Sequence, residues 1–230
     1  MKRPSPKLNV YLETGQKRTF AGAIDWPGWC RSGKDAESAL QALFEYGPRY
    51  SRAIQSAQLD FQPPADSSAM VVAERLAGDA TTEFGAPGIA PAGDALPVDD
   101  AELGRLQALL QACWQAFDAA ALAAAGKELR KGPRGGGRDL EEIIRHTLDG
   151  EAGYLSRLAW KLKLGDEVNL EQKQALIRQA VLDALDASAH GRLPERGPRG
   201  GRLWTVRYYA RRSAWHVLDH AWEIEDRLSA

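Results

Sequence analysis

The sequence has few cysteines, no long apolar run and almost no net charge, and each shortage excludes a class of protein. Its two cysteines, Cys30 and Cys113, cannot form a disulfide framework. No apolar run is long enough to cross a bilayer or to act as a secretory signal. A formal net charge of -1 gives no general attraction to nucleic acid or to an anionic membrane. We therefore expect a cytoplasmic protein without a membrane partner and without a nucleic-acid partner attracted by overall charge.

Several motifs of common enzymes are also missing. The sequence contains no Walker loop, dinucleotide fingerprint, zinc-protease helix motif or nucleophile elbow. Cys113 falls on an apolar helical stripe, where a buried thiol acts as a small hydrophobic group. Cys30 ends the WPGWC turn, and no nearby cation in a fixed position argues for a reactive thiol. Neither a nucleotide cofactor nor a cysteine nucleophile is predicted.

The composition allows either one large core or two small ones, because 44% of the 230 residues are hydrophobic. Three prolines and three glycines interrupt FGAPGIAPAGDALPV at residues 84–98, which excludes a continuous helix or strand there. We predict a Pro/Gly linker at residues 85–98. It separates a first domain, residues 1–84, from a second domain, residues 99–230.

The first domain is predicted to be a small α+β module. KLNVYLET and RTFAGAIDWPGW have the alternation and the β-branched and aromatic content of strands, and a turn at residues 14–16 suggests a hairpin. DAESALQALFEYGPRYSRAIQ is typical of a helix that breaks at Pro48. AMVVAERL is a candidate for a further strand.

The second domain is predicted to be an all-α four-helix bundle. Three helix starts pair a capping side chain with an acid or amide three residues later, as a reciprocal N-terminal cap requires. The pairs are Asp99 with Glu102, Asp139 with Glu142, and Asn169 with Gln172. Apolar residues then recur at spacings of three and four, and a fourth helix is expected from about residue 203 to the C-terminus.

Three of the four histidines have a spacing that suits a metal ion. His216 and His220 lie four residues apart in RRSAWHVLDHAWEIEDR, so a helix places both imidazoles on one face. His146, from another helix, would supply a third ligand. Three neutral imidazoles leave coordination positions open for water or substrate. On a helical wheel, charged residues cluster beside His216. The alternative is therefore that these histidines bind no metal and are either exposed on a solvated face or satisfied within the core.

Neighbouring side chains suggest roles around such a centre. Glu223 shares the face of the histidine pair, so it is the candidate catalytic residue that orients an imidazole or accepts a proton. A simple ion pair with Arg227 accounts for a glutamate at this position equally well. Tyr209 and Arg212 precede the pair on this face and are candidate substrate-binding residues, although packing also explains a tyrosine. Asp219 lies one turn from both His216 and Glu223 and is a candidate contact for the unused ring nitrogen of a ligand histidine.

The string GPRGG occurs twice, at residues 132–136 and 197–201, each time before a helix that carries histidines. Both copies are either flexible, solvated linkers or matching loops at one mouth of the bundle. In the second case Arg134, Arg138, Arg199 and Arg202 would offer cations to an acidic ligand. The second copy is part of RGPRGGRLWTVRYYARR, which mixes arginine with aromatic residues. A solvated or packed helix start explains this stretch more simply than nucleic-acid binding does.

The histidine in DLEEIIRHTLDGEAGYLSRL, followed by WHVLDHAWEIEDR, resembles the DinB-like superfamily of metal-binding four-helix bundles over residues 99–230. The resemblance implies that His146, His216 and His220 bind one divalent ion, commonly zinc or nickel. Several members use low-molecular-weight thiols, so it implies a thiol transferase or hydrolase acting on a small-molecule substrate. The alternative is a non-catalytic protein whose histidines hold a structural or adventitious ion.

The segment VYLETGQKRTFAGAIDWPGWCRSGKDAESALQAL is similar to HicB-type antitoxins, in which a strand pair ending near a Pro-Gly turn precedes a helix. Members of that family neutralise a small RNase toxin, but no DNA-binding ribbon or helix-turn-helix follows here. The resemblance therefore implies a HicB-like module used for packing, dimerisation or ligand gating, and a homodimer is among the expected assemblies.

Overall fold

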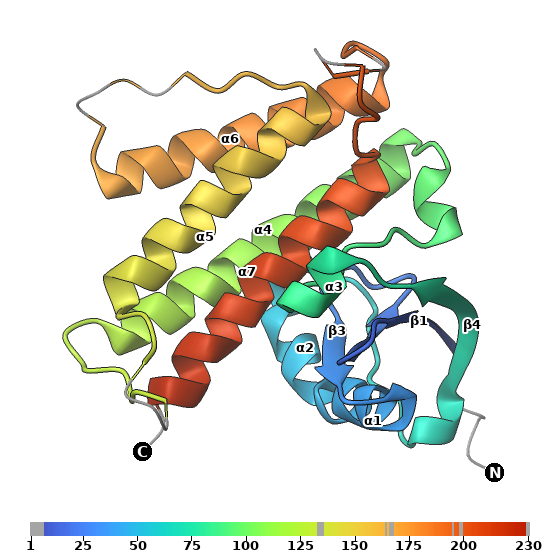
Figure 1. Cartoon of the computed structure of the whole chain (residues 1–230). Helices are drawn as coiled ribbons and strands as arrows, with labels where there is room; N and C mark the ends of the chain where they lie inside the picture. The colour runs from blue at the N-terminus through green and yellow to red at the C-terminus, as the bar shows by residue number, and fades with distance from the viewer. Residues whose placement is uncertain are drawn as a thin grey trace. The chain divides into compact units, whose positions relative to one another are not determined.

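A computed structural model describes residues 7–132, 136–163, 165, 168–194, 196–197 and 200–228. The chain forms two compact units, Met1–Leu96 and Pro97–Ala230. The first contains a four-stranded sheet and the second is mostly helical (Figure 1). Among the described residues, none of the helices combines the length and the apolar character needed to cross a membrane.

The first unit is built on one mixed sheet, with strand order β3-β2-β1-β4. The strands are β1 (Leu8–Thr14), β2 (Thr19–Ala23), β3 (Cys30–Gly33) and β4 (Met70–Ala77). Strands β1, β2 and β3 pair antiparallel, whereas β4 pairs parallel to β1. The helices of this unit are α1 (Ala36–Glu45), α2 (Gly47–Ala53) and α3 (Ala80–Phe84).

The predicted hairpin, helix break and late strand are present. Pro48 lies in the first turn of α2, where its missing N–H costs no helical hydrogen bond, so the chain restarts a helix there. Strand β2 stops at Ala23 instead of running through WPGW, because Trp26 and Trp29 close a turn, with the Trp29 N–H donating to the Trp26 carbonyl (3.2 Å). Strand β3, which was not predicted, has only four residues and pairs with β2.

A buried glutamate fixes the Pro/Gly segment to the first unit. Glu13 of β1 is fully buried, and its carboxylate accepts hydrogen bonds from the N–H groups of Gly88 (2.9 Å) and Ile89 (3.0 Å) and from the Thr82 hydroxyl. Three donors around one buried carboxylate offset much of the desolvation of its charge. These residues therefore belong to the packed unit that ends at Leu96.

The second unit consists of α4 (Asp100–Ala124), α5 (Leu140–Leu155), α6 (Leu170–Ala189) and α7 (Val206–Leu228). The predicted caps are present: Asp99, Asp139 and Asn169 each accept the backbone N–H three residues on. The reciprocal bond forms at α5 and α6. At α4 the Glu102 carboxylate binds Arg105 and Arg207 instead.

Cross-helix contacts define the directions of the helices. Glu102 near the start of α4 contacts Arg207 near the start of α7, and Arg130, after α4, contacts Arg227 at the end of α7, so these helices run parallel. The Trp204 N–H, just before α7, donates to Arg157, just after α5 (2.9 Å), so α5 runs antiparallel to α7. Helix α6 is also antiparallel to α4, and a long segment therefore joins α5 to α6 across the bundle (Figure 1).

The two GPRGG strings do not form a common mouth. The first precedes α5 at the end of the bundle where α7 finishes, and the second precedes α7 at the opposite end (Figure 1). The 23 residues of α7 separate them, and a helix of this length spans roughly 34 Å. The matching-loop hypothesis is therefore wrong. Arg138 and Arg202 are exposed, while Arg134 and Arg199 lie outside the described residues.

Candidate metal centre

Helices α5 and α7 bring three histidines together in the interior of the bundle. His146 comes from α5, and His216 and His220 come from α7. The ring centroids are 5.2 Å apart for His146 and His216, 4.8 Å for His146 and His220, and 4.8 Å for His216 and His220. One nitrogen from each ring lies within 4.8 Å of the others, so the group could hold a metal ion.

The closest pair of nitrogens has the spacing of two ligands on one ion. Nε2 of His146 and Nε2 of His216 are 3.4 Å apart. Two imidazole nitrogens bound tetrahedrally to zinc at the usual bond length are about 3.3 Å apart. An N–H···N hydrogen bond is normally shorter than this separation. The spacing of the His146 and His216 nitrogens therefore fits a divalent ion, and one His220 nitrogen lies within 4.8 Å of both.

The surroundings of His146 and His216 lower the pKa of both rings. His216 and His220 are 6% and 8% exposed, so the solvated-face alternative is wrong for this pair. Burial lowers the pKa of His216 well below its ordinary value, and the proximity of His220 and Arg212 lowers it further. Burial, with Arg138 and His220, also lowers the pKa of half-buried His146. A neutral imidazole keeps the lone pair that a metal requires.

Gly150 allows α5 and α7 to approach closely at the centre. It lies one turn after His146 on α5, and a Cβ added to it would come within 2.5 Å of His216 Cε1 and 3.1 Å of its Nδ1. Any larger residue would therefore push the His216 ring. Gly150 was not among the predicted site residues, although a glycine inside a predicted helix can signal close packing.

Glu223 makes both contacts that its position suggested. One carboxylate oxygen lies 2.8 Å from His220 Nδ1, and the other accepts from Arg227 Nη1 at 2.9 Å. The hydrogen bond with His220 lowers the pKa of Glu223, assisted by the positive charge of Arg227. With Nδ1 facing the carboxylate, the His220 Nε2 is left to face the group. Glu223 therefore orients this imidazole and forms the ion pair at the same time.

The two predicted substrate contacts lie in different surroundings. Arg212 lies one turn before His216, stacked 4.6 Å from the centroid of the Trp215 ring and 5.5 Å from that of Tyr154. Its Nη1 is buried and has no hydrogen-bond partner among the described residues. Tyr209 is fully buried in the bundle core. The tyrosine beside the histidines is Tyr154 of α5, whose ring centroid is 5.6 Å from that of His216; it was not among the predicted site residues.

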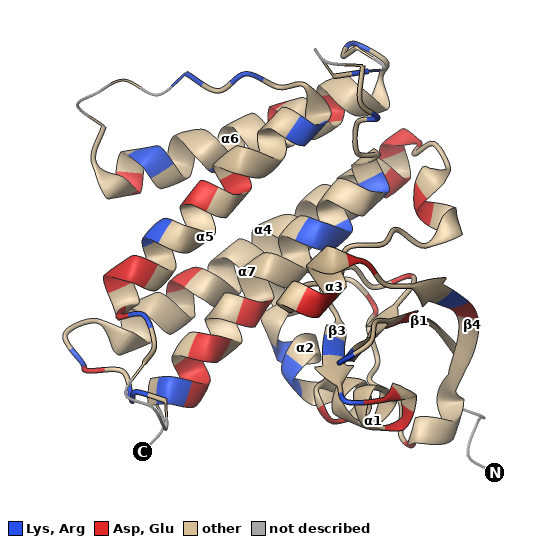
Figure 2. Ribbon diagram, viewed as in Figure 1, with Lys and Arg blue, Asp and Glu red and all other residues tan. Residues whose placement is uncertain are grey.

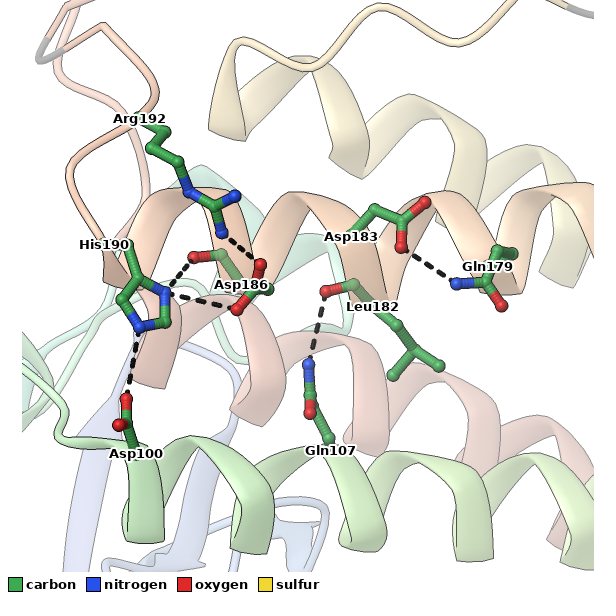
Figure 3. A network of polar contacts seen from close by, with 8 residues as sticks. All are labelled: Asp100, Gln107, Gln179, Leu182, Asp183, Asp186, His190 and Arg192. Carbon is green, nitrogen blue, oxygen red and sulfur yellow. Dashed lines mark hydrogen bonds and ion pairs between the residues drawn. The ribbon is translucent and has the colours of Figure 1, made fainter.

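The remaining histidine belongs to a different network. His190 ends α6, with Nδ1 2.8 Å from the Asp186 carbonyl oxygen and Nε2 3.1 Å from the Asp100 carboxylate at the start of α4 (Figure 3). Arg192 adds an ion pair to the Asp186 side chain. These contacts hold the end of one helix to the start of another, and His190 takes no part in the histidine group.

The arginines of the RGPRGGRLWTVRYYARR stretch that lie on α7 are engaged within the protein. Arg207 pairs with Glu102, Arg211 is buried, and Arg212 is stacked on aromatic rings. Along α5 and α6, basic and acidic residues are interspersed (Figure 2). Neither arrangement provides the one-sided basic surface that favours nucleic acid.

No known protein family, curated protein or solved structure matches the chain. The chemistry of the centre therefore has to be inferred from its own residues.

Proposed function

We propose that this protein binds one divalent metal ion through His146, His216 and His220 and uses it in a transfer or hydrolysis reaction on a small molecule. The observation that carries the proposal is the pair of neutral imidazole nitrogens that face each other at 3.4 Å inside the bundle. His220, oriented by Glu223, completes a set of three nitrogen ligands. Such sets suit zinc or nickel and leave positions open for other ligands.

The chemistry that a bound ion supplies is a lowered pKa of a coordinated thiol or water, which makes a good nucleophile near neutral pH. The protein residues have supporting roles in this proposal. Glu223 holds His220 in one orientation and is the candidate proton acceptor. Arg212 offers a cation beside His216, which favours a substrate that carries a negative charge near its reactive group.

The resemblance to DinB-like proteins supports the same reaction class. One histidine on the second bundle helix and a pair on the last follow the order expected for that superfamily. A low-molecular-weight thiol as co-substrate follows from this resemblance alone, and it makes thiol transfer the first reaction to test.

The metal content of the protein tests the first part of the proposal. The wild-type chain, purified without added metal and analysed for elements, is expected to carry about one zinc or nickel per chain. The single variants His146→Ala, His216→Ala and His220→Ala should each lose the ion, because two imidazoles bind it far more weakly. His190→Ala is the matched control and should keep it, since His190 lies at the far end of α6. Equal metal content in all four variants would overturn the proposal.

The reaction class is tested on the metal-loaded protein. Conjugation of cysteine, mycothiol or bacillithiol to an electrophile is measured for the wild type and for Glu223→Gln. A rate that depends on the metal and falls in the variant supports transfer. Full metal loading without any conjugation or hydrolysis would instead favour the alternative, a non-catalytic protein that holds a structural ion.

We propose that the first unit is a HicB-like module for packing, dimerisation or ligand gating. Its two outer strands, β3 and β4, are the edges through which a sheet extends when two copies associate. The mass of the full chain in solution, measured by light scattering, separates dimerisation from the other two roles.

A further inference from the structure

Buried polar atoms without hydrogen-bond partners among the described residues lie along α7 as far as His216. On α7, Tyr209 Oη, Ser213 Oγ and His216 Nδ1 are buried and have no hydrogen-bond partner among the described residues. They are spaced by four and three residues, so they lie along one face of the helix. Glu151 of α5 adds a fourth atom, because its Oε2 is also buried without a partner.

The Glu151 carboxyl group points into the bundle from α5. Its other oxygen, Oε1, accepts a hydrogen bond from Trp114 Nε1 of α4. Burial raises the pKa of the Tyr209 phenol, and the charge of Glu151 raises it further, so the two side chains interact. Thr147, one turn before Glu151, differs because its buried hydroxyl donates to the Ile143 carbonyl (2.9 Å).

The four atoms are chemically complementary. His216 Nε2 faces His146, so its Nδ1 carries the proton whenever Nε2 acts as a ligand, and Nδ1–H is then a donor. The Glu151 oxygen accepts, and the two hydroxyls both donate and accept. Buried polar groups in native proteins are nearly always satisfied by protein or by ordered water. A water molecule requires two to four such partners in a polar site.

We propose that Glu151, Tyr209, Ser213 and His216 Nδ1 form a binding site for ordered water inside the bundle. One water accepts from His216 Nδ1–H, and further waters along this row of polar atoms serve the two hydroxyls and the carboxyl group. Glu151, Tyr209 and Ser213 are then positioning residues, since they act on the metal centre only through the His216 ring. This last step rests on the proposed metal-binding function, whereas the water site itself does not.

The site has a definite consequence for the His216 ring. A hydrogen bond at Nδ1 fixes the tautomer in which Nε2 is unprotonated, and it also fixes the rotation of the ring. Glu223 does the same for His220 through a direct contact. Two ligands of the centre would thus be oriented in different ways, one by a carboxylate and one by buried water.

The first test uses the metal-free full chain. Nitrogen-15 NMR of the imidazoles is expected to show His216 protonated at Nδ1 in the wild type. The pair of changes Tyr209→Phe and Ser213→Ala removes both hydroxyls, and the tautomer preference should then be lost. Val181→Ala is the control, because it removes part of a buried side chain on α6 and leaves the row of polar atoms intact. A crystal structure of the wild type should contain water within hydrogen-bond distance of Ser213 Oγ and Tyr209 Oη.

The second test measures zinc affinity in the same proteins. The double variant is expected to bind zinc about 10-fold to 100-fold more weakly than wild type and control, the usual effect of losing an outer-shell partner. An His216 protonated at Nε2, or a crystal structure in which the four atoms close on one another without water, would overturn the water site. If the tautomer and the water are present but zinc does not bind, the water site stands and the metal proposal fails.

Discussion

Replacing Gly150 with alanine tests whether the close approach of α5 to His216 builds the centre. The new Cβ would lie 2.5 Å from His216 Cε1, whereas ordinary contact begins at 3.4 Å. The ring must therefore move by about 1 Å, and a close-packed interior resists such a shift. A functional site tolerates errors of about 0.5 Å, so we expect zinc affinity to fall by about 10-fold or more. Titration with zinc against a competing chelator measures this change.

Gly153→Ala is the matched control for this substitution. Gly153 lies on the same helix, and an added Cβ meets nothing within 4 Å. Alanine should therefore stabilise the fold by about 0.5–1 kcal/mol through helix propensity alone. In Gly150→Ala the same gain is opposed by an overpacking cost of about 1–3 kcal/mol. Urea denaturation of both metal-free variants separates the two effects, and equal zinc affinity in Gly150→Ala, Gly153→Ala and wild type would refute the reasoning.

Three further predictions concern pH and the first unit. Burial raises the pKa of Glu151 from 4.5 to about 7. The free energy of unfolding should therefore fall by about 3 kcal/mol as the pH rises from 4.5 to 7. Urea titrations should show that this pH dependence is lost in Glu151→Gln. The hydrogen bond with the Asp186 carbonyl raises the pKa of His190 above 6.5. The stabilisation that protonated His190 provides is therefore complete below pH 6.5 and is lost at higher pH. His190→Asn should be less stable than wild type at pH 5.5 and nearly as stable as wild type at pH 9. Glu13→Ala removes the acceptor of three hydrogen bonds, so it should cost about 3 kcal/mol and speed amide exchange at Ile89.

Features set by neighbouring residues were predictable from the sequence. The caps at Asp139 and Asn169 depend only on side chains three residues apart, and they form as expected. The spacing of His216 and His220 likewise fixes their common helix face. Strand β3 was missed because it has no alternation of its own and exists through its pairing with β2.

Features that depend on the partner helix were not predictable. The charged residues around His216 suggested a solvated face. In the structure Glu223 is engaged by His220 and Arg227, and Arg212 is stacked on Trp215, so these side chains pack within the protein. The GPRGG strings were misinterpreted for a similar reason. Their positions follow from the helix directions, which are set by contacts between residues distant in the sequence.

The buried polar face of α7 indicates that this helix does more than stabilise the fold. Most of this helix is buried, and a buried helix is most stable when its contacts are apolar. Here the buried face carries the polar rings of His216 and His220, opposite a glycine that weakens α5. Each feature costs folding free energy, and together they bring three imidazole nitrogens within 4.8 Å of one another. A shared ligand that binds only the folded chain would offset these costs, and a divalent ion fits both the nitrogen donors and their spacing.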